Sequence, residues 1–188
     1  MPISNEAKIY GYLISHIITG VSEIGDIFIK IEEKSKRNSY AFELQLNGRT
    51  FAKFAVYIKT SSKRISPWRF TFLKQHQEEI LLLDDEYDEV FIALINGNDG
   101  VACFNYETLK VLLDDHFDES EWVSVRRKAR EQYTLAGKDG KMTGKLPLND
   151  FPSAIVDFAL KQLGQESGNT ALDLSSEKNQ KKRIFGLF

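Results

Sequence analysis

Apolar and polar residues alternate from Phe51 to Lys59, and a polar, basic stretch, TSSKR, follows. Successive side chains of a strand point to opposite faces, so the pattern predicts a strand with two distinct faces. One face is wholly apolar and consists of Ala52, Phe54, Val56 and Ile58. The other consists of Phe51, Lys53, Ala55, Tyr57 and Lys59. We expect the wholly apolar face to be the buried one, and Lys59 to end the strand beside a serine-rich basic loop.

The patterns on both sides of this strand predict the elements of the first 95 residues. A helix is expected from Ser4 or Asn5 to Gly20, followed by strands over 26–34 and 39–46. Asn47-Gly48 is a strong hairpin signal between the second strand and the third. Residues 72–83 have helical spacing, and 90–95 form the continuous apolar run of a buried strand. This order implies an α/β fold with a mixed central β-sheet flanked by helices.

The second half of the chain is less regular. Pro67 excludes a regular central strand in SPWRF. A short strand is expected at VACFNY, a helix over 107–113, a strand and basic turn after Trp122, and a helix over 153–163. Residues 164–183 are polar and poor in aromatic residues, which is typical of a flexible linker. We therefore predict one domain over 1–163, followed by a linker and an apolar tail over 164–188.

Composition and charge narrow the class of protein. Hydrophobic residues make up 42% of the 188 residues and aromatic residues 12%, which is enough for a substantial core. The net charge of −2 argues against electrostatic binding over the whole surface but allows a local basic patch. The single cysteine, Cys103, excludes a disulfide framework. Without a signal-peptide pattern or an apolar run of about 18 residues, the chain is predicted to be cytoplasmic, with no membrane association.

The order of elements and the segment VYIKTSSKRISPWRF resemble the core of the PD-(D/E)xK nuclease superfamily, the fold of many restriction enzymes and Holliday-junction resolvases. The resemblance covers about the first hundred residues. It implies a restriction-endonuclease-like αβββαβ core and a protein that processes or binds DNA. If the protein is an enzyme, the resemblance implies a metal-dependent nuclease with Mg²⁺ as its cofactor.

Carried over to this sequence, the resemblance assigns a site but leaves one position unmatched. Lys59 matches the family lysine, Glu43 stands on the preceding strand, and Glu6 stands in the first helix as the third catalytic candidate. The residue two before the lysine is Tyr57 rather than Asp or Glu, and a neutral phenol is a poor Mg²⁺ ligand. Either Glu43 and Asp26 hold the metal ion instead, or catalysis has been lost and the fold serves binding.

Basic residues around Trp68 and in the segment after Trp122 suggest a nucleic-acid contact surface. Such a surface would track phosphates with cations and use an aromatic ring for stacking. The candidate residues are Lys63, Arg64, Trp68, Arg69, Arg126 and Arg127. Simpler interpretations stay open: Glu43 and Lys59 as a cross-strand ion pair, Trp68 as a core residue, and the basic residues after Trp122 as a solvated turn.

The C-terminal residues KKRIFGLF suggest a second kind of function. Apolar side chains after a long polar stretch gain little by remaining in water. The peptide resembles the short motifs by which replication and repair proteins bind sliding clamps, without the usual glutamine. That resemblance implies a non-enzymatic interaction module with a protein partner bound by Ile184, Phe185, Leu187 and Phe188. The alternative is that the tail folds back on its own domain.

Overall fold

A mixed five-stranded sheet forms the centre of the protein in the computed structural model, which describes residues 4–35, 38–114 and 120–165. Its strand order is β1-β2-β3-β5-β6, with β3 parallel to β5 and every other pair antiparallel. The strands are β1 (Phe28–Ser35), β2 (Ser39–Leu46), β3 (Arg49–Ser61), β5 (Glu89–Asn96) and β6 (Val101–Asn105). The predicted α/β class with a mixed sheet is therefore confirmed.

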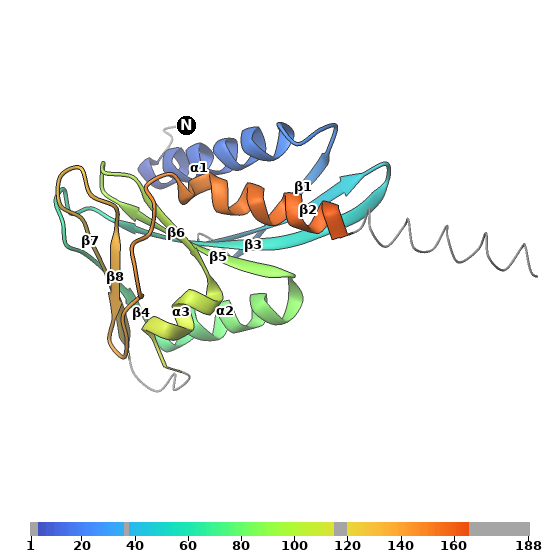
Figure 1. Cartoon of the computed structure of the whole chain (residues 1–188). Coiled ribbons are helices and arrows are strands. Elements are labelled where there is room, and N and C mark those ends of the chain that lie inside the picture. Colours follow the sequence, from blue (N-terminus) through green and yellow to red (C-terminus); the bar gives the residue numbers. More distant parts are fainter. Residues whose placement is uncertain (1–3, 36–37, 115–119, 166–188) are drawn as a thin grey trace, which may run out of the picture.

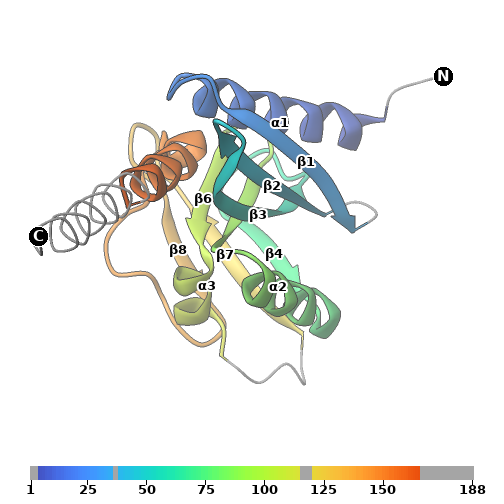
Figure 2. The ribbon, with the colours of Figure 1, turned by 90° about the vertical axis from the view of Figure 1, so that its right-hand side faces the viewer.

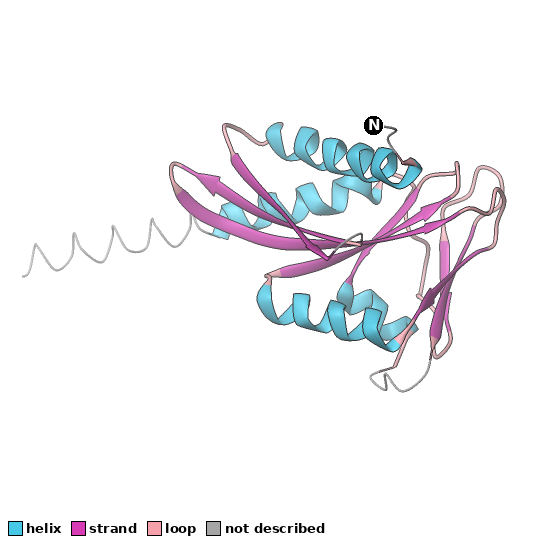
Figure 3. Cartoon of the chain, turned by 180° about the vertical axis from the view of Figure 1, so that it is seen from behind, coloured by secondary structure: helices cyan, strands magenta, loops and turns pink. Residues whose placement is uncertain are grey.

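Helices cover both faces of this sheet. One face carries α1 (Asn5–Ser22) and the helix over 150–165, and the other carries α2 (Lys74–Glu86) and α3 (Tyr106–Leu112). Figure 1 shows the two pairs above and below the sheet, and Figures 2 and 3 show the same layers from the side and from behind. In the described part of the chain, no helix combines the length and the apolar character needed to cross a membrane.

The hairpin between β2 and β3 forms where the sequence predicts it. Asn47 and Gly48 have φ angles of 52° and 77°, the positive values that a two-residue hairpin turn of this kind requires. After β3 the chain crosses the sheet through α2 and returns as β5 beside β3. The succession of a helix, three antiparallel strands, a helix and a parallel strand is thus present, with β4 added before α2.

From Phe54 to Ile58, β3 is buried on both faces, so the expectation that only its wholly apolar face would be buried is wrong. Phe54 and Val56 pack in the core beneath α1 and the helix over 150–165. Ala55 and Tyr57, on the opposite face, are also completely buried, because α2 and a second, smaller sheet cover them. Alternation along β3 therefore separates two cores rather than a core and a surface.

The smaller sheet shares a core with α2 and α3, on the face of the central sheet that carries these two helices (Figure 1). Its antiparallel strands are β4 (Trp68–Phe72), β7 (Glu121–Arg126) and β8 (Thr134–Gly137). The inward face contributes Trp68, Phe70, Phe72, Val123, Val125 and Leu135 to the core. Pro67 precedes β4, which is an edge strand of this sheet, as the proline rule requires.

Candidate functional site

Lys59 lies near the end of β3 in a half-buried polar cluster. Its Nζ is 3.1 Å from Nδ1 of His76, a residue of the first turn of α2, and 5.0 Å from the centre of the Phe72 ring. The same Nδ1 accepts the backbone N–H of Leu73 at 3.1 Å, so His76 also caps its own helix. Glu79, one turn further along α2, accepts a hydrogen bond from the Ser39 hydroxyl at 2.6 Å.

Burial in this cluster changes the acid–base behaviour of two groups. It lowers the pKa of Lys59 to about 8, although the charge of Glu79 opposes the shift. Burial and the neighbouring Lys59 ammonium also lower the pKa of His76, which favours the neutral imidazole at pH 7. Lys59 is therefore a cation held against a neutral ring, and such a perturbed lysine is typical of functional sites but not limited to them.

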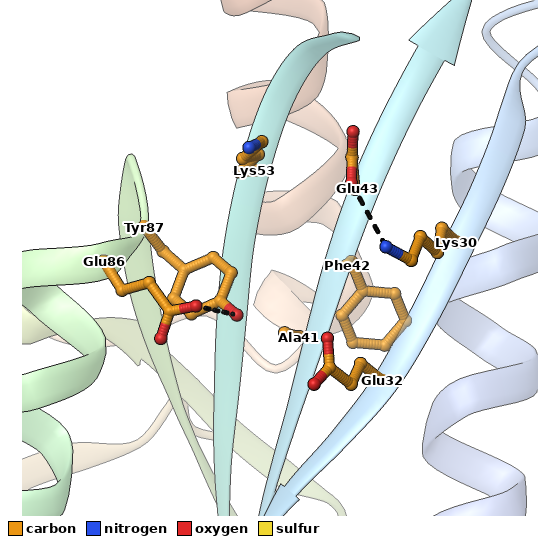
Figure 4. A pocket seen from close by; sticks show the side chains of 8 residues that line it. All are labelled: Lys30, Glu32, Ala41, Phe42, Glu43, Lys53, Glu86 and Tyr87. Carbon is orange, nitrogen blue, oxygen red and sulfur yellow. Dashed lines mark hydrogen bonds and ion pairs between the residues drawn. The ribbon is translucent and has the colours of Figure 1, made fainter.

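The structure does not bring Glu43 to Lys59. The register of β2 and β3 pairs Glu43 with Lys53, and Lys59 lies six residues further along the strand, about 20 Å away. Glu43 instead accepts hydrogen bonds from Thr50 at 2.5 Å and Gln45 at 3.1 Å. It also lies 3.9 Å from Lys30 in an open pocket of about 200 Å³ (Figure 4). Glu43 and Lys59 therefore do not form the cross-strand pair considered as the simpler alternative.

The other two acidic candidates are also away from Lys59. Asp26 is exposed in the bend before β1. The start of β1 pairs with the end of β2, which in turn pairs with the start of β3. Glu6 is exposed in the first turn of α1, which covers the opposite face of the sheet. On β2 the residue paired with Tyr57 is Ser39, whose side chain has no carboxylate. Among the described residues, the carboxylate associated with Lys59 is that of Glu79, which sequence analysis did not single out.

Several predicted nucleic-acid-binding residues do come together, in an open groove of about 450 Å³ between the loop after β3 and the outer face of the smaller sheet. The groove is lined by Ser61, Ser62, Lys63, Pro67, Arg69, Trp122, Ser124 and Arg126. The guanidinium carbon of Arg69 is 4.1 Å from the centre of the Trp122 ring, a cation–π contact. No Asp or Glu of the described residues lines the groove.

The remaining members of the predicted set have other positions. Trp68 is 2% exposed, and its Nε1–H donates to the Lys63 carbonyl at 2.9 Å, so it supports the loop from below. Arg127 forms a two-pronged ion pair with Asp99, which also accepts a hydrogen bond from Tyr133 at 3.0 Å. Arg64 is exposed in the loop but is not among the groove-lining residues.

Three further carboxylates lie close enough together to share a metal ion. Asp114, Glu121 and Asp139 each place one oxygen within 4.8 Å of the others. The sequence does not reveal this cluster, because Asp114 and Glu121 lie in the acidic stretch DDHFDESE and Asp139 in the glycine- and lysine-rich stretch GKDGKMTGK. Their proximity depends on how α3, β7 and β8 pack, which no local pattern indicates.

Comparisons with known proteins give no relative for this chain. No protein-family model matches it, and no match is found among curated proteins or solved structures. The four tail residues predicted to bind a partner, Ile184, Phe185, Leu187 and Phe188, lie outside the described residues.

Proposed function

We propose that this protein binds nucleic acid through the groove lined by Lys63, Arg69, Trp122 and Arg126, on a nuclease-like scaffold without metal-dependent catalysis at Lys59. The observation that carries the proposal is the concentration of three cations and one aromatic ring in a single groove. Phosphate groups are bound chiefly by such cations, and bases by such rings. Since the net charge of the chain is only −2, this is a local surface rather than a general property of the protein.

The loop that forms one wall of the groove is anchored at several points. The Lys63 carbonyl accepts the Trp68 indole N–H, and the Lys63 ammonium donates to the Pro67 carbonyl at 2.7 Å. The Ser66 hydroxyl accepts the backbone N–H of Arg127 at 3.0 Å. In the turn after β5, Gly97 has a φ angle of 57°, and a Cβ at this position would lie 2.4 Å from the Lys63 carbonyl oxygen. These contacts support the loop in the position that completes the groove.

The surroundings of Lys59 support the second part of the proposal. A Mg²⁺ ion at a nuclease centre is held by several carboxylate or carbonyl oxygens, and the ion activates water and neutralises charge on the phosphate. Tyr57 is completely buried, Ser39 faces it across the strands, and Glu43 pairs with Lys53 instead. The acidic ligands that the resemblance calls for are therefore not gathered at this lysine in the described residues.

Binding is tested with a triple variant, Lys63→Ala, Arg69→Ala and Arg126→Ala, measured by fluorescence anisotropy on labelled single-stranded and duplex DNA and RNA. We expect at least a tenfold loss of affinity at low salt. We also expect the slope of log K against log salt to fall by about 2–3, since each lost phosphate contact contributes about 0.7–0.9.

The matched control replaces three exposed lysines elsewhere, Lys8→Ala, Lys141→Ala and Lys161→Ala, and so changes the net charge equally. This control is expected to retain most of the affinity. Equal losses in the two variants would show a general charge effect, and no measurable binding of the parent at low salt would refute the proposal.

Catalysis is tested by incubating the full chain with single-stranded, duplex and branched DNA in Mg²⁺ or Mn²⁺. We expect no cleavage above background. Robust cleavage that disappears in Lys59→Ala would show that acids from elsewhere in the chain complete a metal centre.

A second candidate function rests on the C-terminal sequence KKRIFGLF, whose resemblance to clamp-binding peptides favours docking to a sliding clamp. Deletion of residues 184–188 is expected to abolish retention on immobilised clamp while the thermal midpoint stays unchanged. A large fall in that midpoint would instead show that the tail packs against the domain.

A further inference from the structure

Glu121, the first residue of β7, is a buried carboxylate in an unusual environment. Only 1% of the residue is exposed. Among the described residues, no N–H or O–H group is placed to donate a hydrogen bond to either carboxylate oxygen. An ionised carboxylate removed from water is strongly unfavourable unless a cation or several donors compensate it. Within the described part of the chain, Glu121 therefore lacks the hydrogen-bond donors that normally compensate a buried acid.

The groups that Glu121 does approach are two further carboxylates. Asp114 follows α3 and Asp139 follows β8, both exposed, and each has an oxygen within 4.8 Å of the others in the cluster. Three acids at such distances repel one another when ionised. A divalent cation between them would supply the missing charge and make use of the oxygens of Glu121.

The backbone around Asp139 is fixed in a way that maintains this arrangement. The Asp139 N–H donates to the Leu112 carbonyl at the end of α3 at 3.2 Å. Gly137 and Gly140 permit the close approach, because a Cβ at either position would lie 1.9 Å or 2.0 Å from a carbonyl oxygen of α3. The turn after β8 is thus packed directly onto the element that Asp114 follows.

From this geometry we infer that Asp114, Glu121 and Asp139 form a binding site for a hard divalent cation of the Ca²⁺ type. Oxygen-only ligands select Ca²⁺, Mg²⁺ and Mn²⁺ over softer metals. Two oxygens bound to one Ca²⁺ at about 2.4 Å lie at most about 4.8 Å apart, so the spacing suits this ion with little movement. The exposed sides of Asp114 and Asp139 leave room for water ligands. This inference does not depend on nucleic-acid binding.

The competing arrangement is a proton shared between Glu121 and Asp139. Burial, together with contact with Asp139, raises the pKa of Glu121 to about 7, whereas the charge of Lys138 opposes the rise. A proton and a metal ion would occupy the same oxygens, so the two arrangements make opposite predictions about added cations.

The test uses the full chain after dialysis against EDTA, with the thermal midpoint measured in CaCl₂, MgCl₂ or MnCl₂ at constant ionic strength. In CaCl₂ at about 100 times the dissociation constant, the midpoint is expected to rise by about 5–10 °C. Calorimetric titration should give one ion per chain. Glu121→Gln and Asp114→Asn should each abolish most of the rise, and the second substitution changes only an exposed side chain.

Glu131→Gln is the matched control, because Glu131 is a partly exposed acid outside the cluster whose ion-pair partner is Lys145. It should keep the full response to the cation. The inference is overturned if none of the three ions shifts the midpoint of the parent chain, or if Glu121→Gln and Asp114→Asn both respond as the parent does. A parent without a cation response that becomes more stable on Glu121→Gln would identify the shared-proton arrangement.

Discussion

Lys53 and Lys59 lie on the same face of β3, six residues apart, and their surroundings differ sharply. Lys53 is exposed, faces Glu43 across the strands and is near Glu86 and Lys30 around an open pocket (Figure 4). Lys59 is half-buried between the Phe72 ring and the neutral imidazole of His76. Acidic and basic side chains both surround Lys53. Near Lys59, the acid whose charge favours the protonated lysine is Glu79.

The difference shows that a lysine at the expected position of a motif is not sufficient to identify a catalytic centre. The acid that the sequence offered, Glu43, belongs to the balanced surface network around Lys53. Lys59, whose pKa is lowered by burial, lies in a different environment that α2 and β4 largely form. Three substitutions test how far the two ends of β3 differ.

Tyr57→Ala should have the largest effect, because Tyr57 is completely buried beneath the Lys59 cluster. Loss of a buried aromatic side chain is expected to lower the free energy of unfolding by about 3–5 kcal/mol. Urea unfolding followed by circular dichroism measures the change. Lys53→Ala, on the exposed part of the same face, should change it by no more than about 0.5 kcal/mol. Similar losses in the two variants would contradict the contrast between the two ends.

Lys59→Met should increase stability at pH 7, because the variant removes a half-buried ammonium. The expected gain is about 1–2 kcal/mol, less than the full pKa shift implies, since water still reaches the group. Lys59 loses its proton near pH 8 in the native state and near pH 10.5 when unfolded. Between these values the unfolded chain binds more protons, so the stability of the parent rises with pH.

The difference between Lys59→Met and the parent should therefore shrink from pH 8 to pH 10.5. Thermal midpoints of both proteins across this range provide the measurement, with Lys53→Met as the matched control on the exposed part of the same face. A gain that stays constant with pH would mean that packing, rather than the charge of Lys59, is responsible.

Glu43→Gln should have the smallest effect. Hydrogen bonds from Thr50 and Gln45 lower the pKa of Glu43, but its surroundings are open to water, where such interactions stabilise little. We expect no measurable change in the thermal midpoint and none in the response to Mg²⁺ or Ca²⁺. A lost metal response in this variant would place a metal ion at Glu43 rather than at Glu121.

Much of the fold was predictable, because its signals are local. The Asn47-Gly48 turn and the alternation on both sides of it determine the hairpin of β2 and β3. The apolar run VFIALI corresponds to β5, which is buried on both faces as such a run predicts. The second covered face of β3 was not predictable, since it depends on the smaller sheet, whose three strands come from distant parts of the chain.

The candidate site was predictable only in part. Period-two alternation indicates which face a residue occupies but not which residue lies opposite it. Glu43 was expected near Lys59, yet a register shift after Leu44 and the pairing of Ser39 with Tyr57 place Glu43 at Lys53. The basic residues in and next to β4 and β7 were identified from the sequence, whereas Trp122 was not. The position of Trp122 beside Arg69 depends on the antiparallel pairing of β4 with β7.

The anchored loop between β3 and β4 has a consequence for the kinetics of the proposed nucleic-acid binding. The loop is already held by hydrogen bonds from Trp68 to the Lys63 carbonyl and from Arg127 to the Ser66 hydroxyl, and by the close approach of Gly97. A ligand that enters the groove therefore does not have to order this segment, and little conformational entropy is lost on association. Binding to such a preformed wall is expected to be limited by diffusion and electrostatic attraction, with affinity differences among groove variants arising mainly from how fast the ligand leaves.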